Sequence, residues 1–348
     1  MKGSSVNPTM KQTLPLVVVL DDREGLLSRS AGVERMRALA DVRVLTGSLD
    51  QLSPAERERV SVLMAVRERT RLDAATLATL PALELLLQSG GHAYHVDADY
   101  AALRGLPVAL GRGGLGARAA VPELTFALAV SALRLMPAAH HSMTVGEWRP
   151  FLGRNLSGRT LGILGLGRHG SNVARIAQAY GMHVVAWDRA RPAADPGAEA
   201  WPERLPLDAL LRMSDVVTVH LKLSDQSHGL LTEARLLSMK QGSVLINTAR
   251  GAIIDEEALA RVLRSGPIAA AGLDVFTEEP LPPSSPLRSL ANVVLTPHIG
   301  WTVEEVLTEF ADTAAGQLEA YRDGCLERQE LLDARVQLGS PRFGGLGD

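Results

Sequence analysis

The chain has 348 residues, of which 46% are hydrophobic and 22% charged, and its 36 Lys and Arg residues nearly balance its 39 Asp and Glu residues. This length predicts two domains, and the balanced charge provides no polybasic surface for nucleic acid or anionic lipid. The composition therefore favours a soluble enzyme with a small-molecule substrate. The single cysteine, Cys325, cannot form an internal disulfide, which fits a reducing cytoplasm.

No membrane segment is expected. Residues 1–12 are polar and lack the apolar core of a signal peptide, so we expect a disordered tail. The most apolar helical run, residues 124–133, is bracketed by Glu123 and Arg134 and is shorter than a bilayer requires.

The first third of the chain alternates short β-branched runs with helical stretches. Strands are predicted at 16–20, 42–45, 60–66, 83–87 and 107–110. Such alternation is typical of βα units in a parallel sheet. A glycine-rich loop at 111–116 then precedes a helix predicted over 121–136.

The alternation of strands and helices continues through the second half of the chain. A strand at 160–164 and a helix at 171–179 are followed by strands at 184–187, 216–221, 243–246, 269–273 and 293–295. Thr302 and Glu305 have the spacing of a capping box, and the apolar residues beyond them repeat at helical spacing to about residue 321. The last residues, 337–348, are glycine-rich and are expected to be loose.

Gly165, Gly167 and Gly170 form a Gly-x-Gly-x-x-Gly motif between the strand at 160–164 and the helix at 171–179. The first glycine permits a tight turn, the second lets backbone approach a pyrophosphate, and the third allows close helix–strand packing. The helix N-terminus offers N–H donors to phosphate. A merely tight turn is the alternative interpretation of this motif.

Asp188 strengthens the interpretation as a dinucleotide site. It ends the next predicted strand, 18 residues beyond Gly170, where a carboxylate can accept hydrogen bonds from ribose hydroxyls. Asp188 would repel a 2′-phosphate and so favours NAD. Arg189 and Arg191 could instead pair with that phosphate, which keeps NADP as the alternative, although solvated surface arginines are the simpler interpretation.

Three polar islands, residues 247–251, 274–280 and 296–300, each directly follow a predicted strand. They supply a cation, a carboxylate and an imidazole at the strand ends of a parallel sheet. Such a set can bind an α-keto acid and transfer a proton to it.

With the glycine loop, Asp188 and the islands in this order, the chain resembles the D-isomer-specific 2-hydroxyacid dehydrogenase family. The resemblance covers residues 83–304. It implies an α/β fold of two Rossmann-like or flavodoxin-like domains with parallel sheets, the nucleotide domain being inserted into the substrate domain. We therefore expect residues 1–115 with 303–348 to form the substrate domain and 116–302 the NAD-binding domain.

Arg250 is predicted to orient the substrate. A guanidinium offers a planar fork of donors to a carboxylate and the neighbouring carbonyl, which lysine cannot match, and the resemblance implies this role. A structural salt bridge at a strand end is the alternative.

His298 is predicted to be the general acid in ketone reduction and the base in alcohol oxidation, because imidazole titrates near neutral pH. The resemblance implies that Glu279 holds its ring and favours the imidazolium. Glu278 is the competing carboxylate, but Glu279 lies immediately before Pro280, as the catalytic glutamate of the family does.

The resemblance implies further cofactor contacts. Asp274 corresponds to a position near the nicotinamide carboxamide, with a strand-end cap as the alternative. Thr248 and Ala249 correspond to backbone that lines the cofactor. Arg168 and His169 occupy the variable positions of the glycine loop, where the backbone N–H is the useful group. No metal site is expected.

Ser89, Gly90 and Gly91 match a loop whose backbone N–H groups face the substrate carboxylate in relatives, and small residues permit that approach. Arg67 and Arg69 follow another strand, near where relatives that bind phosphorylated substrates contact the anion. With Glu68 between them, a local ion-pair surface is the favoured interpretation.

The overall prediction is an NAD(P)-dependent D-2-hydroxyacid dehydrogenase, or 2-oxo acid reductase, that yields D-2-hydroxy acids and, by resemblance, forms a cytoplasmic homodimer. Lys222 departs from the proline frequent in relatives, and its role is open, as are the identity of the acid and the physiological direction. Two alternatives stay open. One is an NAD-sensing binding protein of the corepressor type, and the other is a formate- or phosphite-type dehydrogenase on the same scaffold.

Overall fold

The computed structural model describes residues 14–111, 114, 116–188 and 202–338. The N-terminal tail, part of the glycine-rich loop at 111–116, Arg189, Arg191 and most of the C-terminal segment 337–348 lie outside these residues. The chain forms two compact units, Met1–Gly114 with Glu304–Asp348, and Leu115–Val303. The domain bounds expected from the sequence differ from these by one residue at each of the two boundaries between the units. That the first unit binds substrate stays a prediction.

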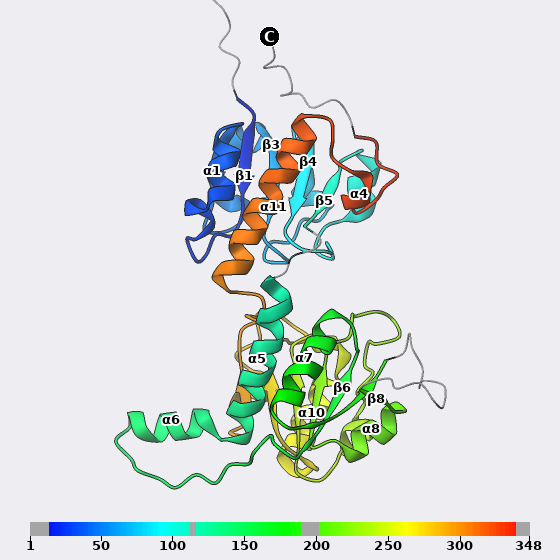
Figure 1. Ribbon diagram of the computed structural model, residues 1–348. Coiled ribbons are helices and arrows are strands. Elements are labelled where there is room, and N and C mark those ends of the chain that lie inside the picture. Colours follow the sequence, from blue (N-terminus) through cyan, green and yellow to red (C-terminus); the bar gives the residue numbers. More distant parts are fainter. Residues whose placement is uncertain (1–13, 112–113, 115, 189–201, 339–348) are drawn as a thin grey trace, which may run out of the picture. The chain divides into compact units, whose positions relative to one another are not determined.

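The first unit is built on a five-stranded parallel sheet (Figure 1). Its order is β2 (Asp41–Val44), β1 (Leu16–Val19), β3 (Val60–Ala65), β4 (Leu85–Gln88) and β5 (Val108–Leu110). The helical elements are α1 (Ala31–Arg37), α2 (Pro54–Arg57), α3 (Ala74–Ala78), α4 (Ala98–Leu103), α11 (Glu304–Arg322) and the short turns η1 (Leu27–Arg29), η2 (Leu49–Gln51) and η5 (Arg328–Glu330).

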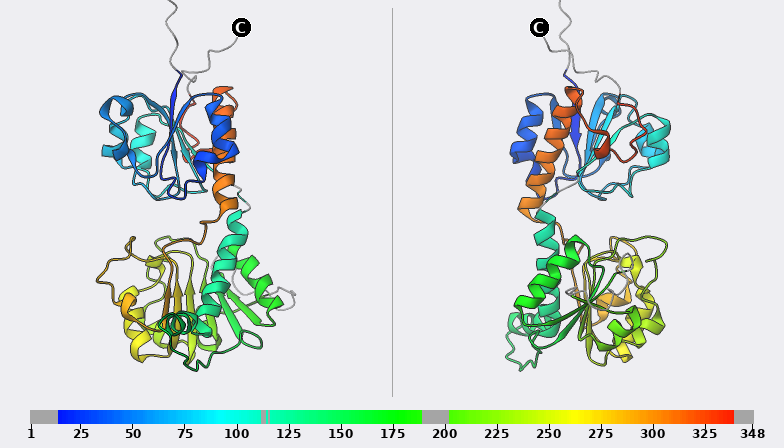
Figure 2. Two further views of the ribbon diagram at one scale, coloured as in Figure 1. Left: turned by 90° about the vertical axis from the view of Figure 1, so that its left-hand side faces the viewer. Right: turned by 45° about the vertical axis from the view of Figure 1, so that its right-hand side comes forward.

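Helices α1 and α11 pack together on one face of this sheet, and α2, α3 and α4 lie on the other (Figure 2). Gly32 permits the contact of α1 with α11, because a Cβ there would lie 2.3 Å from the carbonyl carbon of Ala311. The strands are largely apolar, as expected for a parallel sheet covered on both faces.

The second unit contains a seven-stranded parallel sheet. Its order is β12 (Val293–Leu295), β11 (Ile268–Leu273), β10 (Ser243–Asn247), β9 (Val216–Val219), β6 (Thr160–Leu164), β7 (His183–Trp187) and β8 (Glu203–Arg204). The helical elements are α5 (Gly116–Leu133), α6 (Met136–Thr144), α7 (Arg168–Ala179), α8 (Leu207–Met213), α9 (Glu233–Leu237), α10 (Glu256–Ser265), η3 (Gly251–Ile253) and η4 (Pro286–Ser289).

Two apolar cores lie on opposite faces of this sheet. Along β6, Ile163 packs with residues of α5 and α7, whereas Leu164 packs with residues of α8, α9 and α10. The strand order reverses between β6 and β9, because the chain continues from β6 to β7 on one side and returns to β9 on the other. In open α/β sheets, ligands bind outside the carboxyl ends of the strands at such a switch point. The expected α/β fold class is confirmed.

Helix α5 corrects two expectations. It begins at Gly116 and ends at Leu133, where Leu135 adopts a left-handed conformation and α6 follows. By length and composition alone, the 18 residues of α5 are enough to cross a membrane, so the expectation that this apolar segment is too short is wrong. Its contacts with β10, β11 and α7 explain its apolar character by packing.

Candidate active site

The glycine motif forms the turn between β6 and α7. Gly165 has φ of 97°, and a Cβ there would lie 2.8 Å from the carbonyl oxygen of His220. A Cβ at Gly170 would lie only 2.0 Å from the Gly165 carbonyl oxygen, so α7 could not start so close to β6 with any other residue. At Gly167, the N-cap of α7, a Cβ would meet no atom within 4 Å. The turn therefore exposes the first amide groups of α7 beside open space.

The side chains around this turn are placed as follows. Asp188 is half-buried directly after β7. Arg168 is exposed and His169 half-buried in the first turn of α7. His220 follows β9, and its Nε2 lies 2.9 Å from Thr218 Oγ1. Burial, followed by the charge of His169, lowers the pKa of His220 to about 3, so its ring is neutral at pH 7.

Arg250 lies in a tightly held loop after β10. Asn247, which is buried, donates from its side chain to the Arg250 carbonyl at 2.9 Å and accepts from the Ala249 N–H at 3.0 Å. Thr248 Oγ1 lies 3.1 Å from Thr125 Oγ1 of α5. A Cβ at Gly251 would lie 1.9 Å from the carbonyl carbon of Phe276, so this loop packs against the loop after β11.

His298 and Glu279 form a hydrogen-bonded pair. His298 Nδ1 lies 2.7 Å from Glu279 Oε2, and Glu279 Oε1 accepts from the Phe276 N–H at 2.9 Å. Burial opposes ionisation of Glu279, but the hydrogen bond and charge of His298, the Phe276 amide and the charge of Arg250 together lower its pKa. The carboxylate is thus ionised and holds one edge of the imidazole.

Asp274 fixes the loop that carries His298. Its buried carboxylate accepts from Thr296 Oγ1 at 2.6 Å and from the N–H groups of Ile299 and Gly300, both at 2.8 Å. Burial raises the pKa of Asp274 despite these three donors. His298 itself has φ of 54°, a left-handed conformation that costs energy in a non-glycine residue and is held here by the flanking bonds.

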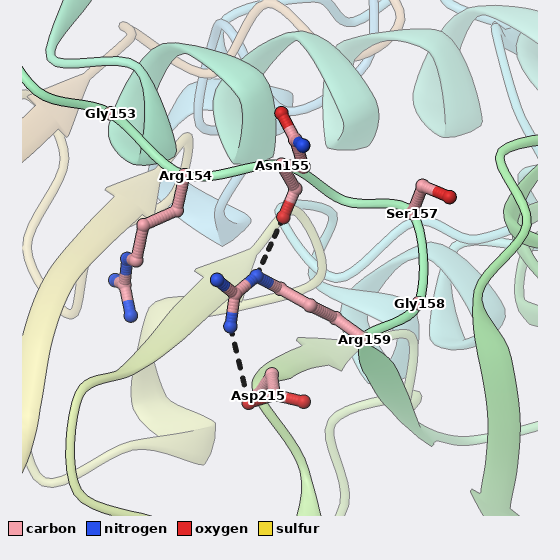
Figure 3. A pocket seen from close by; sticks show the side chains of 7 residues that line it. All are labelled: Gly153, Arg154, Asn155, Ser157, Gly158, Arg159 and Asp215. Atoms are coloured by element: carbon pink, nitrogen blue, oxygen red, sulfur yellow. Dashed lines mark hydrogen bonds and ion pairs between the residues drawn. The ribbon is translucent and has the colours of Figure 1, made fainter.

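A cavity of about 510 Å³ lies at the other edge of the same sheet (Figure 3). It is lined by residues 153–155, 157–159 and Asp215, at the amino ends of β6 and β9. Asp215 there pairs with Lys240 at 2.8 Å and with Arg159 at 3.5 Å, and accepts from the Thr160 N–H at 2.9 Å. These bonds connect the amino ends of β6 and β9, which indicates a structural role for Asp215.

Comparison with known proteins agrees with the geometry. Residues 126–300 match the model of the D-isomer specific 2-hydroxyacid dehydrogenase, NAD binding domain. The chain is 40% identical over 282 residues to the glyoxylate reductase of Aeropyrum pernix, covering 78% of this chain and 83% of that protein. It is 36% identical over 244 residues to the D-3-phosphoglycerate dehydrogenase of Archaeoglobus fulgidus, covering 70% of this chain and 46% of that protein.

A solved structure extends the similarity to both units. The TT0316 protein from Thermus thermophilus matches with a TM-score of 0.76 and 35% identity, covering 89% of this chain and 97% of that one. The chain belongs to the D-isomer-specific 2-hydroxyacid dehydrogenase family. It is an NAD(P)-dependent oxidoreductase acting on 2-hydroxy acids, as the sequence motifs predicted.

The matched NAD-binding domain of this dehydrogenase includes the glycine turn and all three islands. The sequence did not reveal the residues that hold these loops in place. Asn247 and Thr125 hold the Arg250 loop, and neutral His220 lies beside the glycine turn. For Asn247 and His220, their position at strand ends could have indicated this role. No sequence signal indicated it for Thr125, because Thr125 lies on a helix distant in sequence.

In the first unit of this dehydrogenase, the expected substrate loop follows β4. Ser89 is buried and accepts from the Arg67 N–H at 2.7 Å. Gly90 has φ of 116°, a backbone conformation that strains any other residue, and Arg67 Nη1 lies 2.2 Å from the position of a Cβ there. Gly91 is exposed.

Proposed function

We propose that the protein reduces small 2-oxo acids to D-2-hydroxy acids, with His298 as proton donor, Glu279 as its partner and Arg250 as the substrate anchor. The observation that carries the proposal is the 2.7 Å pair between His298 Nδ1 and Glu279 Oε2 at the carboxyl edge of the NAD-binding sheet. A carboxylate held by a backbone N–H fixes the ring and leaves Nε2 as the nitrogen that exchanges a proton with substrate.

His298 performs the acid–base step in this proposal. In reduction, its Nε2–H protonates the oxygen of the former ketone, and Glu279 stabilises the imidazolium before transfer. In oxidation, the same nitrogen accepts the hydroxyl proton. The three hydrogen bonds of Asp274 keep the loop fixed, so the ring is already placed when substrate binds.

Arg250 orients the substrate in this proposal. Its charge lowers the pKa of Glu279, which supports a guanidinium within electrostatic reach of the acid–base pair. The planar fork can donate to the substrate carboxylate and the adjacent carbonyl oxygen. Ser89, Gly90 and Gly91 are proposed to bind a substrate carboxylate through backbone N–H groups.

The residues around the glycine turn fit a dinucleotide. Open space at Gly167 and the N-terminus of α7 suit a pyrophosphate, with Gly165, Arg168, His169 and Gly170 forming the turn. Asp188 is proposed to bind the adenosine ribose hydroxyls, and Thr248, Ala249 and Asp274 to lie beside the nicotinamide half. When bound, NADH supplies the hydride. NAD is the proposed preference, with NADP as the alternative.

The protein is also proposed to be a cytoplasmic homodimer. Residues 135–152 form an arm made of α6 and the chain after it, which extends from the body of the second unit (Figure 1). Trp148 is 89% exposed and Leu152 93%, and five further large apolar side chains on the arm are exposed. Apolar surface gathered in this way favours association, here with a second copy. Sedimentation velocity would detect a monomer if the proposal is wrong.

A screen of substrates tests the activity. NADH and NADPH oxidation would be followed with glyoxylate, hydroxypyruvate, pyruvate, phenylpyruvate and phosphohydroxypyruvate. We expect turnover of at least one acid, with the D enantiomer as product on chiral chromatography for every acid except glyoxylate, whose product is achiral. Tight NADH binding with no turnover of any acid would overturn the proposal.

A further inference from the structure

In the first unit, the loops after β3 and β4 carry a closed cluster of three charged or titratable side chains. Arg67 Nη2 lies 3.2 Å from His92 Nε2, Glu68 Oε1 lies 3.0 Å from His92 Nδ1, and Glu68 Oε2 lies 3.6 Å from Arg67 Nε. Their side chains are only 15% to 25% exposed. Arg67 therefore already has a carboxylate partner.

This cluster packs directly on the proposed substrate loop. The Arg67 N–H donates to Ser89 Oγ, and Arg67 Nη1 occupies the space that a Cβ of Gly90 would need. Gln88 Nε2 donates to the carbonyl oxygens of Arg67 and His92 at 3.5 and 3.0 Å, which joins the two loops beneath the side chains. A group bound at residues 89–91 therefore lies beside Arg67 and Glu68.

The second arginine at this edge is also paired. Arg69 makes two bonds to Glu24, at 2.8 and 2.5 Å, and one to the Asp21 carbonyl at 2.8 Å. The hydrogen bond from Arg69 is the largest cause of the lowered pKa of Glu24. Glu24 is therefore ionised and neutralises Arg69.

The charged side chains at this edge give no excess of positive charge. Arginines and carboxylates of the described loops after β1 and β3 nearly balance, with four arginines against five carboxylates, namely Arg23, Arg67, Arg69 and Arg71 with Asp21, Asp22, Glu24, Glu68 and Asp73. Burial lowers the pKa of nearby His95 to about 4, so that ring adds no charge at pH 7. A second anionic group on the substrate would find no excess of positive charge among these described side chains.

We propose that Glu68 makes this edge selective for 2-oxo acids whose remaining substituent is uncharged, and that it rejects those carrying a phosphate or a second carboxylate. The inference rests on the proposed function of the loop at residues 89–91. A substrate phosphate bound by Arg67 would share its guanidinium with Glu68, whose half-buried carboxylate would then face a dianion. Two anionic groups beside one guanidinium repel each other, so Glu68 opposes binding of the phosphate.

The test compares two substrates that differ only in a phosphate. With NADH, kcat and KM would be measured for hydroxypyruvate and phosphohydroxypyruvate in the wild type, Glu68→Gln and Glu68→Ser. We expect the wild type to prefer hydroxypyruvate by about 100-fold or more in kcat/KM. Glu68→Gln should reduce that ratio by roughly tenfold, because it removes one charge near a dianion. The change should appear in the KM of the phosphorylated substrate.

Glu34→Gln provides the matched control. Glu34 pairs with Arg37 on α1, so this variant changes the net charge equally on the surface of the same unit. Its substrate ratio should equal that of the wild type. Glu68→Ser covers the case in which the glutamine variant fails to fold, since it also removes the charge.

The outcomes separate the two proposals. If the wild type uses both substrates equally, or if both Glu68 variants retain the wild-type ratio with hydroxypyruvate activity intact, the role of Glu68 is overturned and the proposed function stands. A wild type that is inactive on all 2-oxo acids would overturn both. A reduced ratio in the Glu68 variants and not in Glu34→Gln supports the inference.

Discussion

The two edges of the NAD-binding sheet each contain a carboxylate held by backbone N–H donors, but they use it differently. At the amino edge, Asp215 is neutralised by Lys240 and Arg159 and ties β6 to β9. At the carboxyl edge, Asp274 accepts from neutral donors and fixes the loop of His298. The cavity lies at the amino edge, whereas the titratable pair lies at the carboxyl edge. The titratable His298–Glu279 pair therefore distinguishes the carboxyl edge from the amino edge, where the carboxylate is neutralised by cations.

The largest expected effect comes from the imidazole. His298→Asn should lower kcat by about 10²- to 10⁴-fold, because general acid catalysis is lost. NADH affinity, measured by fluorescence titration, should stay unchanged. His183, exposed at the start of β7 on the amino edge, provides the control, and His183→Asn should retain full turnover. Equal losses in both variants would remove the distinction between the edges.

Arg250→Lys is expected to have the second largest effect on catalysis. It keeps the charge but loses the planar fork, so kcat/KM should fall by about 10²-fold, with a raised KM for the 2-oxo acid. Steady-state kinetics would measure both constants. Arg264→Lys, at an exposed position on α10, should have no effect. An unchanged KM in Arg250→Lys would contradict the role of substrate anchor.

Glu279→Gln should reduce turnover by about tenfold and change its pH dependence. The pKa of Glu279 is lowered, so its charge is present above the ordinary carboxyl range and is lost only as pH falls through that lowered value. The wild type should therefore lose turnover as acid protonates Glu279, and the variant, which has no carboxylate there, should lack this loss in a pH profile of kcat. A variant that keeps this loss would show that Glu279 only packs against the ring.

Asp215→Asn should give the smallest effect on chemistry. It removes the pairs with Lys240 and Arg159, and we expect the free energy of unfolding to fall by about 1–3 kcal/mol with kcat unchanged. Burial opposes ionisation of Asp215, yet Lys240, the Thr160 N–H and Arg159 lower its pKa. Its contribution is therefore present above the unfolded value near 3.8 and is lost in acid. Urea denaturation at about pH 7 and about pH 3 would measure the difference between variant and wild type, which should shrink at the lower pH.

Much of the fold was predictable because its signals are local. Apolar β-branched runs marked the strands, and in a parallel sheet all carboxyl ends meet at one edge, so the polar residues after them had to gather there. The break after α5 was not predictable, because the left-handed conformation of Leu135 has no sequence signal in a leucine. Helix α6, which begins directly after Leu135, was therefore not predicted from the sequence as a separate helix.

The sequence by itself determined the family, the α/β class, the NAD-binding motif and the three islands that follow strands. Only the tertiary structure decided which groups meet: that Glu279 lies 2.7 Å from His298, and that Asp274 holds the His298 loop. It also decided that Glu68 joins Arg67 and His92. The reason is physical. Periodicity and turn residues act over a few positions, whereas hydrogen bonds and ion pairs join residues separated by 19 or 25 positions, where only packing fixes the distance.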